Sequence, residues 1–509
     1  MIRSVIRTPR FIPRLKPQQF SLLHTSNSVG QANFHRPDEA GSNDAADAAD
    51  ATPTILADQN DMQKLPNKVT WIQAIREREK QLAEGKVLDS YSYVNPVTTA
   101  VGEKTREESF TYLTLPFKDD KWLCDAYVNA SGRLRAGQLF QDLDALAGRI
   151  AYRHCSPAEP VNVTASVDRI YMVKKVDEIT NYNFVLAGAV TWTGRSSMEI
   201  TVKGYAFEDQ IPEHITEDAL PDENIFLSAN FTFVARNPIT HKSFAINRLL
   251  PVTEGEWLDY RRAESHNAKK KLAAKNKGMS EPSSSESKLI YELWKNSKSI
   301  VANGGDKPSN VRFSNETRVT STLFMQPQYR NRHSYMIFGG YLLRQSFELA
   351  YCASAAFASS SPRFVSLDST TFKAPVPVGS VLSLTASIAY TEHIHDGSKY
   401  VEADSPFDFS LPATNKISPN KDAFLSEPGT LIQVKVDTTI QPLDSPKAKE
   451  SGTFIYSFFV PKSAIAEGKP GFCSVIPQTY SEMMDYVEGR RRAQDTANYV
   501  DTLPKLGEL

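Results

Sequence analysis

The sequence lacks the features that would connect it to nucleic acid, a membrane or a structural metal. Its 58 basic and 59 acidic residues nearly cancel, so no excess of positive charge is available to bind a polyanion. No stretch approaches the roughly 20 apolar residues of a membrane-spanning helix. The cysteines, which are Cys124, Cys155, Cys352 and Cys473, form no C-x-x-C pair. We therefore expect no nucleic-acid partner, no membrane insertion, no disulfide framework and no metal.

Acidic residues are missing from the first 37 positions, where basic residues alternate with apolar ones. The basic residues are Arg3, Arg7, Arg10, Arg14, Lys16 and Arg36. This composition is typical of a mitochondrial targeting segment, although a disordered basic tail is the alternative. Residues 38–65 then form an Ala- and Asp-rich low-complexity spacer. We expect a protein of the mitochondrial matrix.

Two segments about 200 residues apart share one layout. Each has a loop asparagine, a pair of small residues and an apolar stretch with helical spacing. The asparagines are Asn129 and Asn331, and the pairs are Ala136-Gly137 and Gly339-Gly340. Glycine at a helix start lets a ligand approach backbone N–H groups that have no intrahelical partner. A plain Gly-Gly helix entry is the alternative.

Long strand-like segments follow each predicted helix, with alternation such as that of Ile432, Val434 and Val436. A sheet that curls around a single apolar helix buries that helix without a second helical layer. Two such units can also pair through their sheet edges. We predict an α+β chain of two tandem units, each a curled antiparallel sheet around a central helix, joined as an intramolecular pseudo-dimer.

The expected boundaries follow from these segments and from the composition between them. The region 257–277 is rich in Arg, Lys and Ala, and the region 278–287 contains Pro and five serines, which indicates a linker. The predicted parts are a first unit with an N-terminal helix over 66–256, a linker over 257–311, a second unit over 312–475, and a C-terminal helix and tail over 476–509.

Several motifs, in this order, resemble the hotdog fold in its mitochondrial double-hotdog form, the acyl-CoA thioesterases of the thioesterase 9 type. They lie at Ala165–Ile170, Val190–Glu199, Arg330–Leu342, Phe347–Ala350 and Tyr486–Arg491. The resemblance runs from about Phe110 to Arg492. It implies hydrolysis of fatty acyl-CoA to free acid and coenzyme A with no cofactor, since the coenzyme A thioester is the substrate. It also implies a homo-oligomer.

Thioester hydrolysis needs a polarised carbonyl, a nucleophile and stabilisation of the oxyanion. The resemblance implies a shared site, with the loop asparagine of one unit facing the helix carboxylate of the other. Helical periodicity places Asp144 at the border of the buried stripe, whereas the equivalent position in the second helix is Phe347. We therefore predict that Asp144, Asn331 and the helix start at Gly340 form the catalytic site.

Other residues are weaker candidates. Asn129 and Glu348 form a reciprocal second pair that we expect to be weakened or idle. Gly339 and His333 lie near the predicted helix start and are candidates for binding the substrate, although a loop histidine bonded to the backbone is the alternative. A turn containing Arg195 and Ser196 offers contacts for a coenzyme A phosphate, or is simply a turn. His393 and His395 are expected in a solvated loop.

Two other functions fit the pattern. A hotdog enoyl-CoA hydratase or dehydratase would pair Asp with a His several residues on, and we expect a His in neither helix. A non-catalytic acyl-CoA-binding or assembly protein would tolerate Phe347 in place of Asp. The sequence leaves open the acyl chain length, the oligomeric state and whether one or both sites act.

Overall fold

The computed structural model describes residues 98–502, except 239, 276–280, 303, 306, 308, 332–335, 396–412, 417–424 and 470. The predicted targeting segment, the spacer and the helix expected before residue 98 lie outside this part, as does His333. Within the described residues, no helix is long and apolar enough to cross a membrane.

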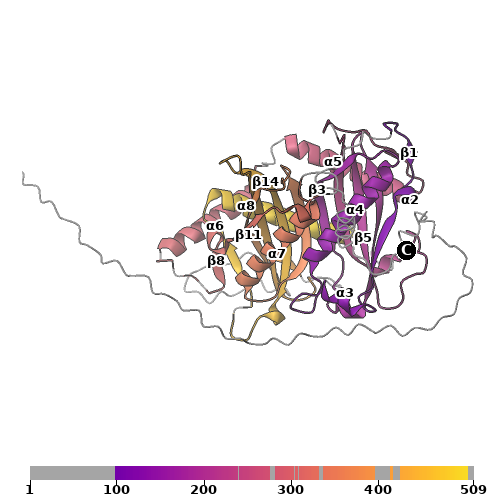
Figure 1. Ribbon diagram of the computed structural model, residues 1–509. Helices are drawn as coiled ribbons and strands as arrows, with labels where there is room; N and C mark the ends of the chain where they lie inside the picture. The colour runs from indigo at the N-terminus through magenta and orange to yellow at the C-terminus, as the bar shows by residue number, and fades with distance from the viewer. Residues whose placement is uncertain are drawn as a thin grey trace, which may run out of the picture. The chain divides into compact units, whose positions relative to one another are not determined.

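The first half is one helix surrounded by antiparallel strands (Figure 1). The helix is α4 (Ala136–Cys155), and the strands are β2 (Thr111–Leu115), β3 (Val161–Met172), β4 (Asn183–Thr193), β5 (Ser197–Phe207) and β6 (Ile225–Arg236). The sheet order is β3-β6-β5-β4-β2. Because α4 contacts all five strands, the sheet wraps around the helix. The predicted stripe of Leu139, Leu143, Leu146 and Ile150 is buried there.

The second half repeats this plan. Its helix is α7 (Gly339–Ala358), and its strands are β9 (Val319–Phe324), β10 (Arg363–Phe372), β11 (Val381–His395), β12 (Ala413–Lys416), β13 (Gly429–Gln441) and β14 (Lys449–Pro461). The order is β12-β11-β13-β14-β10, and β9 also pairs with β11. In each half the Ser hydroxyl of a Ser-x-Asp pair donates to the Asp carboxylate, Ser166 to Asp168 at 2.8 Å and Ser366 to Asp368 at 2.7 Å. Both halves are hotdog units, as predicted.

The two halves form one 11-stranded sheet, because β3 and β10 pair antiparallel at the junction. Their register sets Ser366 opposite Tyr171 and Thr371 opposite Ser166. The central helices also touch, and the rings of Phe140 on α4 and Phe347 on α7 lie 5.2 Å apart between centroids. The predicted edge-to-edge pseudo-dimer is confirmed.

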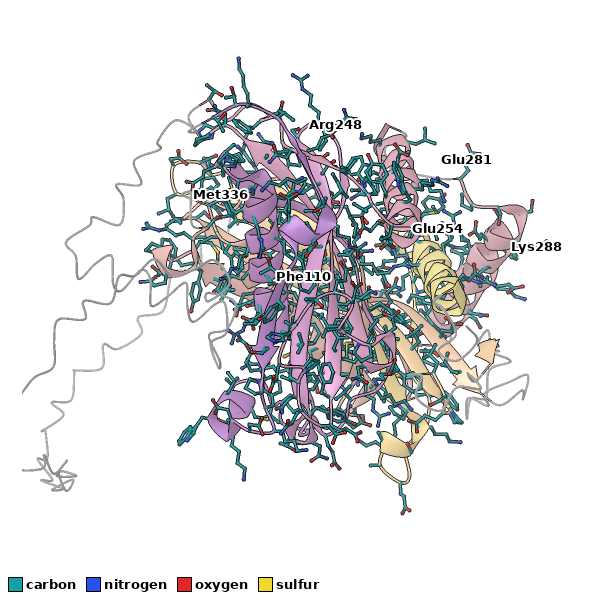
Figure 2. All side chains as sticks on the ribbon, turned by 90° about the vertical axis from the view of Figure 1, so that its right-hand side faces the viewer. Phe110, Arg248, Glu254, Glu281, Lys288 and Met336 are labelled. Carbon is teal, nitrogen blue, oxygen red and sulfur yellow. The ribbon has the colours of Figure 1, made fainter. Side chains whose placement is uncertain are left out.

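The remaining helices include α5 (Glu254–Lys275) and α6 (Ser284–Ala302) between the halves, and α8 (Tyr480–Thr502) after them. Helix α5 contacts β4 and α8 contacts β11. Figure 2 shows the helices around Glu254 and Lys288 on the opposite side of the sheet from Met336. The short elements are β1 (Glu103–Lys104), α2 (Arg106–Ser109), α3 (Lys121–Asp125), β7 (Arg248–Leu249), β8 (Val311–Phe313) and β15 (Ser474–Ile476).

Two expectations about histidines are wrong. His393 lies on β11 rather than in a solvated loop, and it is buried with its Nε2 3.0 Å from the carbonyl oxygen of Cys473. Helix α4 extends to Cys155 and so contains a histidine, His154. The apolar pattern weakens in this last turn, but packing against the segment that follows β6 holds the turn helical, and His154 Nε2 lies 2.9 Å from the carbonyl oxygen of Asn247.

Candidate active site

The carboxylate of Asp144 lies where the two halves meet. Its Oδ2 accepts the N–H of Gly340 at 2.7 Å, and its Oδ1 accepts the hydroxyl of Thr164 at 2.8 Å. The side chain is 1% exposed. Gly340 is the second residue of α7, so its N–H has no acceptor within its own helix and is free to bind Asp144. The structure thus brings together two of the three residues predicted to act.

Burial sets the acidity of this carboxylate. It raises the pKa of Asp144 from 3.8 to about 6, although the hydrogen bonds from Thr164 and Gly340 favour the ionised form and act in the opposite direction. A group with a pKa near 6 is ionised at neutral pH and is basic enough to take a proton from water. Perturbed carboxylates of this kind are concentrated at functional sites.

The two glycines at the start of α7 serve different purposes. A Cβ atom on Gly339 would lie 3.0 Å from Oδ2 of Asp144 and 3.3 Å from Oγ1 of Thr164, so this glycine leaves space beside the carboxylate. A Cβ atom on Gly340 would lie 2.9 Å from the Cα of Gln141, so that glycine lets α7 approach α4. Gly339 therefore faces the site, while Gly340 lets the two helices pack closely and donates its N–H to Asp144.

Asn331 lies in the loop that leads into α7. Its N–H donates to the carbonyl of Met336 at 2.7 Å, as the N–H of Asn129 donates to the carbonyl of Arg133 at 2.8 Å in the loop before α4. The two asparagines therefore occupy equivalent positions, and the second loop is one residue longer. The Asn331 side chain is half-buried. Its pairing with Asp144 remains a prediction, and its neighbour His333 lies outside the described residues.

The reciprocal site has different chemistry. Matching bulges in β3 and β10 make Thr164 equivalent to Phe364, and matching helix starts make Asp144 equivalent to Phe347. These two phenylalanine rings pack against each other, 5.4 Å apart between centroids. A phenylalanine pair can neither take a proton nor hold water, so this site lacks the carboxylate and hydroxyl of the first.

The reciprocal candidates Asn129 and Glu348 line one cavity, and each has another partner. Oε1 of Glu348 accepts Nε of Arg135 at 2.8 Å. Oδ1 of Asn129 accepts the N–H of Ser131 at 2.9 Å and of Arg133 at 3.0 Å. These bonds fix the loop before α4.

Arg195 and Ser196 lie in the turn between β4 and β5. The carbonyl of Arg195 accepts the N–H of Ile246 at 3.1 Å, while its side chain is exposed. The sheet register sets Thr164 opposite Phe233 and Ser197 opposite Val234, which places this turn at the same end of the sheet as Thr164. Their contact with coenzyme A remains a prediction.

Sequence reasoning missed Thr164. The signal was present, because Asp144 and Thr164 are both matched by phenylalanines in the other repeat, Phe347 and Phe364. A carboxylate and a hydroxyl that are replaced together by aromatic rings in the other copy indicate two side chains in contact. Reading these differences as a pair would have added Thr164 to the site.

The hydratase alternative requires a histidine near the acid. His154 is on the same helix as Asp144 but ten residues further on, or about 15 Å along the axis. It is buried, and burial lowers its pKa, while the backbone carbonyl of Asn247 favours the charged form. It therefore does not lie near the carboxylate of Asp144.

We predict that Asp144→Asn changes how stability depends on pH. The folded-state pKa of about 6 exceeds the ordinary 3.8, so wild-type protein loses stability as the pH rises between these values. The free energy of unfolding of the wild type falls by about 3 kcal/mol over this range, and that of the variant does not. Urea unfolding between about pH 4 and 7 measures the difference, which should grow with pH in favour of the variant. A constant difference would show that Asp144 titrates at its ordinary value.

Comparisons with known proteins find several that are similar in sequence to this chain. No family model matches the sequence. The chain is 34% identical to the chloroplastic acyl-coenzyme A thioesterase 2 of Humulus lupulus, over 57% of this chain and 65% of that protein. It is 34% identical to the mitochondrial acyl-coenzyme A thioesterase 4 of the same plant, over 58% of this chain and 55% of that protein. The chain thus spans less than two thirds of these plant relatives.

A longer match joins the chain to an animal protein. It is 26% identical to the mitochondrial acyl-coenzyme A thioesterase 9 of Mus musculus, over 84% of this chain and 87% of that protein. Among solved structures, an acyl-ACP thioesterase from Bacteroides thetaiotaomicron matches with a TM-score of 0.35 and 12% identity, over 70% of this chain and 100% of that one. The sequence is thus similar to acyl-coenzyme A thioesterases, and the similarity to the mitochondrial thioesterase 9 type extends over both halves of the chain.

Proposed function

We propose that the protein is an acyl-CoA thioesterase that hydrolyses fatty acyl-CoA to a free fatty acid and coenzyme A at a single site. The observation that carries this proposal is the buried carboxylate of Asp144, held by a hydroxyl from its own half and a helix N–H from the other. The names of the sequence relatives support the same activity and substrate class.

In this mechanism Asp144 acts as the general base. It takes a proton from a water whose oxygen attacks the thioester carbonyl, the carbon–sulfur bond breaks, and the sulfur receives a proton to leave as the coenzyme A thiol. Direct attack by the carboxylate, through an anhydride that water then opens, is the other route. Both routes need the ionised form of Asp144.

The other residues have supporting roles in the proposal. Because the N–H of Gly340 is already donated to Asp144, it orients the base rather than the substrate. The side-chain amide of Asn331 is then the donor for the oxyanion. Gly339 gives the thioester room beside the carboxylate. Thr164 fixes the second carboxylate oxygen and is a positioning residue.

The cellular setting belongs to the proposal as well. The basic, acid-free first 37 residues and the mitochondrial names of full-length relatives support location in mitochondria, which we propose to be the matrix. Acyl-CoA is the proposed partner, and a homo-oligomer of double-hotdog protomers is the proposed assembly.

Thiol release from a series of acyl-CoA chain lengths tests the function directly. We expect thiol release. In the pH profile, log kcat/KM should rise by one per pH unit up to about pH 6 and then stay constant, because the base must be ionised.

The hydroxyl of Thr164 sets where this rise ends. Thr164→Ala removes a hydrogen bond to the carboxylate, which should move the end of the rise to a higher pH by about one unit. Thr164→Ser keeps the hydroxyl and should leave the pH profile unchanged.

Two results would oppose the proposal. Hydration of enoyl-CoA without thiol release would favour a hydratase, and binding of acyl-CoA with neither reaction would favour a non-catalytic protein.

Thiol reagents react slowly at acidic pH. In that range hydrolysis is measured by the loss of the ultraviolet absorbance of the thioester.

A further inference from the structure

The site that lacks the carboxylate and the hydroxyl still contains a cavity. Its volume is about 370 Å³, and it lies between the two halves. The loop before α4 and the end of β3 form one side, and α7 with the start of β10 forms the other. Phe347 and Phe364, which replace Asp144 and Thr164, line its wall. The cavity can therefore hold a ligand away from Asp144 and Thr164.

The charged side chains of the cavity do not balance. Its three guanidinium groups belong to Arg133, Arg135 and Arg363, and its two carboxylates belong to Asp177 and Glu348. Arg135 pairs with Glu348 at 2.8 Å. Arg363 lies 3.5 Å from Asp177 and also pairs at 3.0 Å with Glu427, which is outside the lining. The lining thus has one positive charge more than it has negative charges.

Arg133 carries the unbalanced charge. Its side chain is half-buried and makes no ion pair with any described carboxylate, and its guanidinium donates to the hydroxyl of Ser361 at 3.3 Å. Burial, and after it the neighbouring Arg363, lower the pKa of Arg133, while Tyr351 and Asp177 act in the opposite direction with smaller effect. A half-buried cation without a carboxylate is costly, and a ligand with one negative charge would compensate for it.

The rest of the lining is apolar and limits the size of the ligand. Leu134, Met172 and Tyr351 join the two phenylalanines around the cavity. A volume of about 370 Å³ is near the lower end of small-molecule pockets, which run from about 300 to 1,000 Å³. Coenzyme A, with its several phosphate charges, exceeds both the volume and the one unbalanced positive charge.

We propose that this cavity binds a free fatty acid, with its carboxylate on Arg133 and its hydrocarbon tail against Phe347 and Phe364. The choice of a fatty acid among monoanions with an apolar tail rests on the proposed hydrolysis, which releases one. The ligand would contact α7, the helix whose Gly340 N–H orients Asp144. The fatty acid released at the Asp144 site would thereby lie against α7, a helix that also contributes to that site.

Calorimetric titration of dodecanoate into the full chain tests the proposal. Arg133→Gln should weaken one binding event by about tenfold or more, because it removes a charged hydrogen-bond donor. Arg236 lies on β6 and pairs with Val161 at the end of β3 that is far from the cavity. Arg236→Gln therefore removes the same charge elsewhere and should not affect this binding event. Glu348→Gln frees Arg135 from its ion pair and should tighten binding.

A second variant tests the cavity without changing its charge. Ala130 is exposed at the rim, so Ala130→Trp can fill the entrance without entering the core, and it should abolish the same binding event. Equal affinity in Arg133→Gln, Ala130→Trp and wild type would overturn the proposal. If the wild type releases thiol from acyl-CoA under that outcome, only the fatty acid site fails. Binding as expected without thiol release would refute only the proposed hydrolysis.

Discussion

Asp144→Asn is expected to lower kcat/KM for acyl-CoA hydrolysis on the order of 10²- to 10⁴-fold while leaving the protein folded, since this is the range that a general base contributes. Asparagine has the shape of aspartate, and its carbonyl oxygen can still accept one of the two hydrogen bonds that Gly340 and Thr164 donate. It cannot take a proton from water or attack the thioester. The measurement is thiol release at neutral pH, where wild-type Asp144 is ionised.

The same helix provides a matched control. Asp142 is also buried, and its Oδ2 accepts the hydroxyl of Tyr127 at 2.5 Å, away from Gly340 and Thr164. Asp142→Asn makes the same chemical change two residues away and should retain hydrolysis. If both variants lost activity equally, the loss would reflect damage to α4, and Asp144 would not be the base.

Much of the fold followed from pattern alone. The buried stripe of α4 has helical period, and the repeat placed Gly137 and Gly340 at equivalent helix starts. Pairing of the two units through a sheet edge followed from the need to cover an exposed strand edge, and the structure identifies the strands as β3 and β10. These features depend on local sequence or on a general property of sheets, so a single chain is enough to predict them.

The site was only partly predictable, because contacts between distant residues do not appear in local periodicity. The phase of the helix placed Asp144 beside its apolar stripe, but the hydroxyl of Thr164 comes from a strand that only the wrapped sheet brings near. The burial of His393 likewise depends on Cys473, which is 80 residues away. What the sequence lacks in such cases is the register of one element against another.

The asymmetry of the two halves is the main functional consequence of the structure. The two copies of the unit place an equivalent loop asparagine and helix start in each half. Here one site has Asp144 and Thr164, while the other has a phenylalanine pair and a cavity. The aromatic pair adds apolar contact between the halves, so the second site contributes packing where the first has a carboxylate and a hydroxyl.

The two loop asparagines allow a direct test of this asymmetry. Asn331→Ala should lower kcat/KM by about 10²- to 10³-fold, which is the usual cost of losing one oxyanion donor. Asn129→Ala makes the same change at the equivalent loop position, but it faces the site that has Phe347 in place of the base. It removes two loop hydrogen bonds, from Ser131 and Arg133, and should mainly cost stability. We therefore expect the activity loss in Asn331→Ala to exceed that in Asn129→Ala at least tenfold.

The kinetic form of the loss separates the roles of these residues. An oxyanion donor acts in the transition state, so Asn331→Ala should reduce kcat and leave KM nearly unchanged. The rise of log kcat/KM up to about pH 6 should also persist, because Asp144 keeps its contacts with Gly340 and Thr164.

Equal losses in the two asparagine variants would mean that both sites hydrolyse substrate, and a larger loss in Asn129→Ala would assign the reaction to the cavity beside Glu348. Because the double variant Asp144→Asn, Asn331→Ala removes two parts of one site, its loss should be smaller than the product of the single losses.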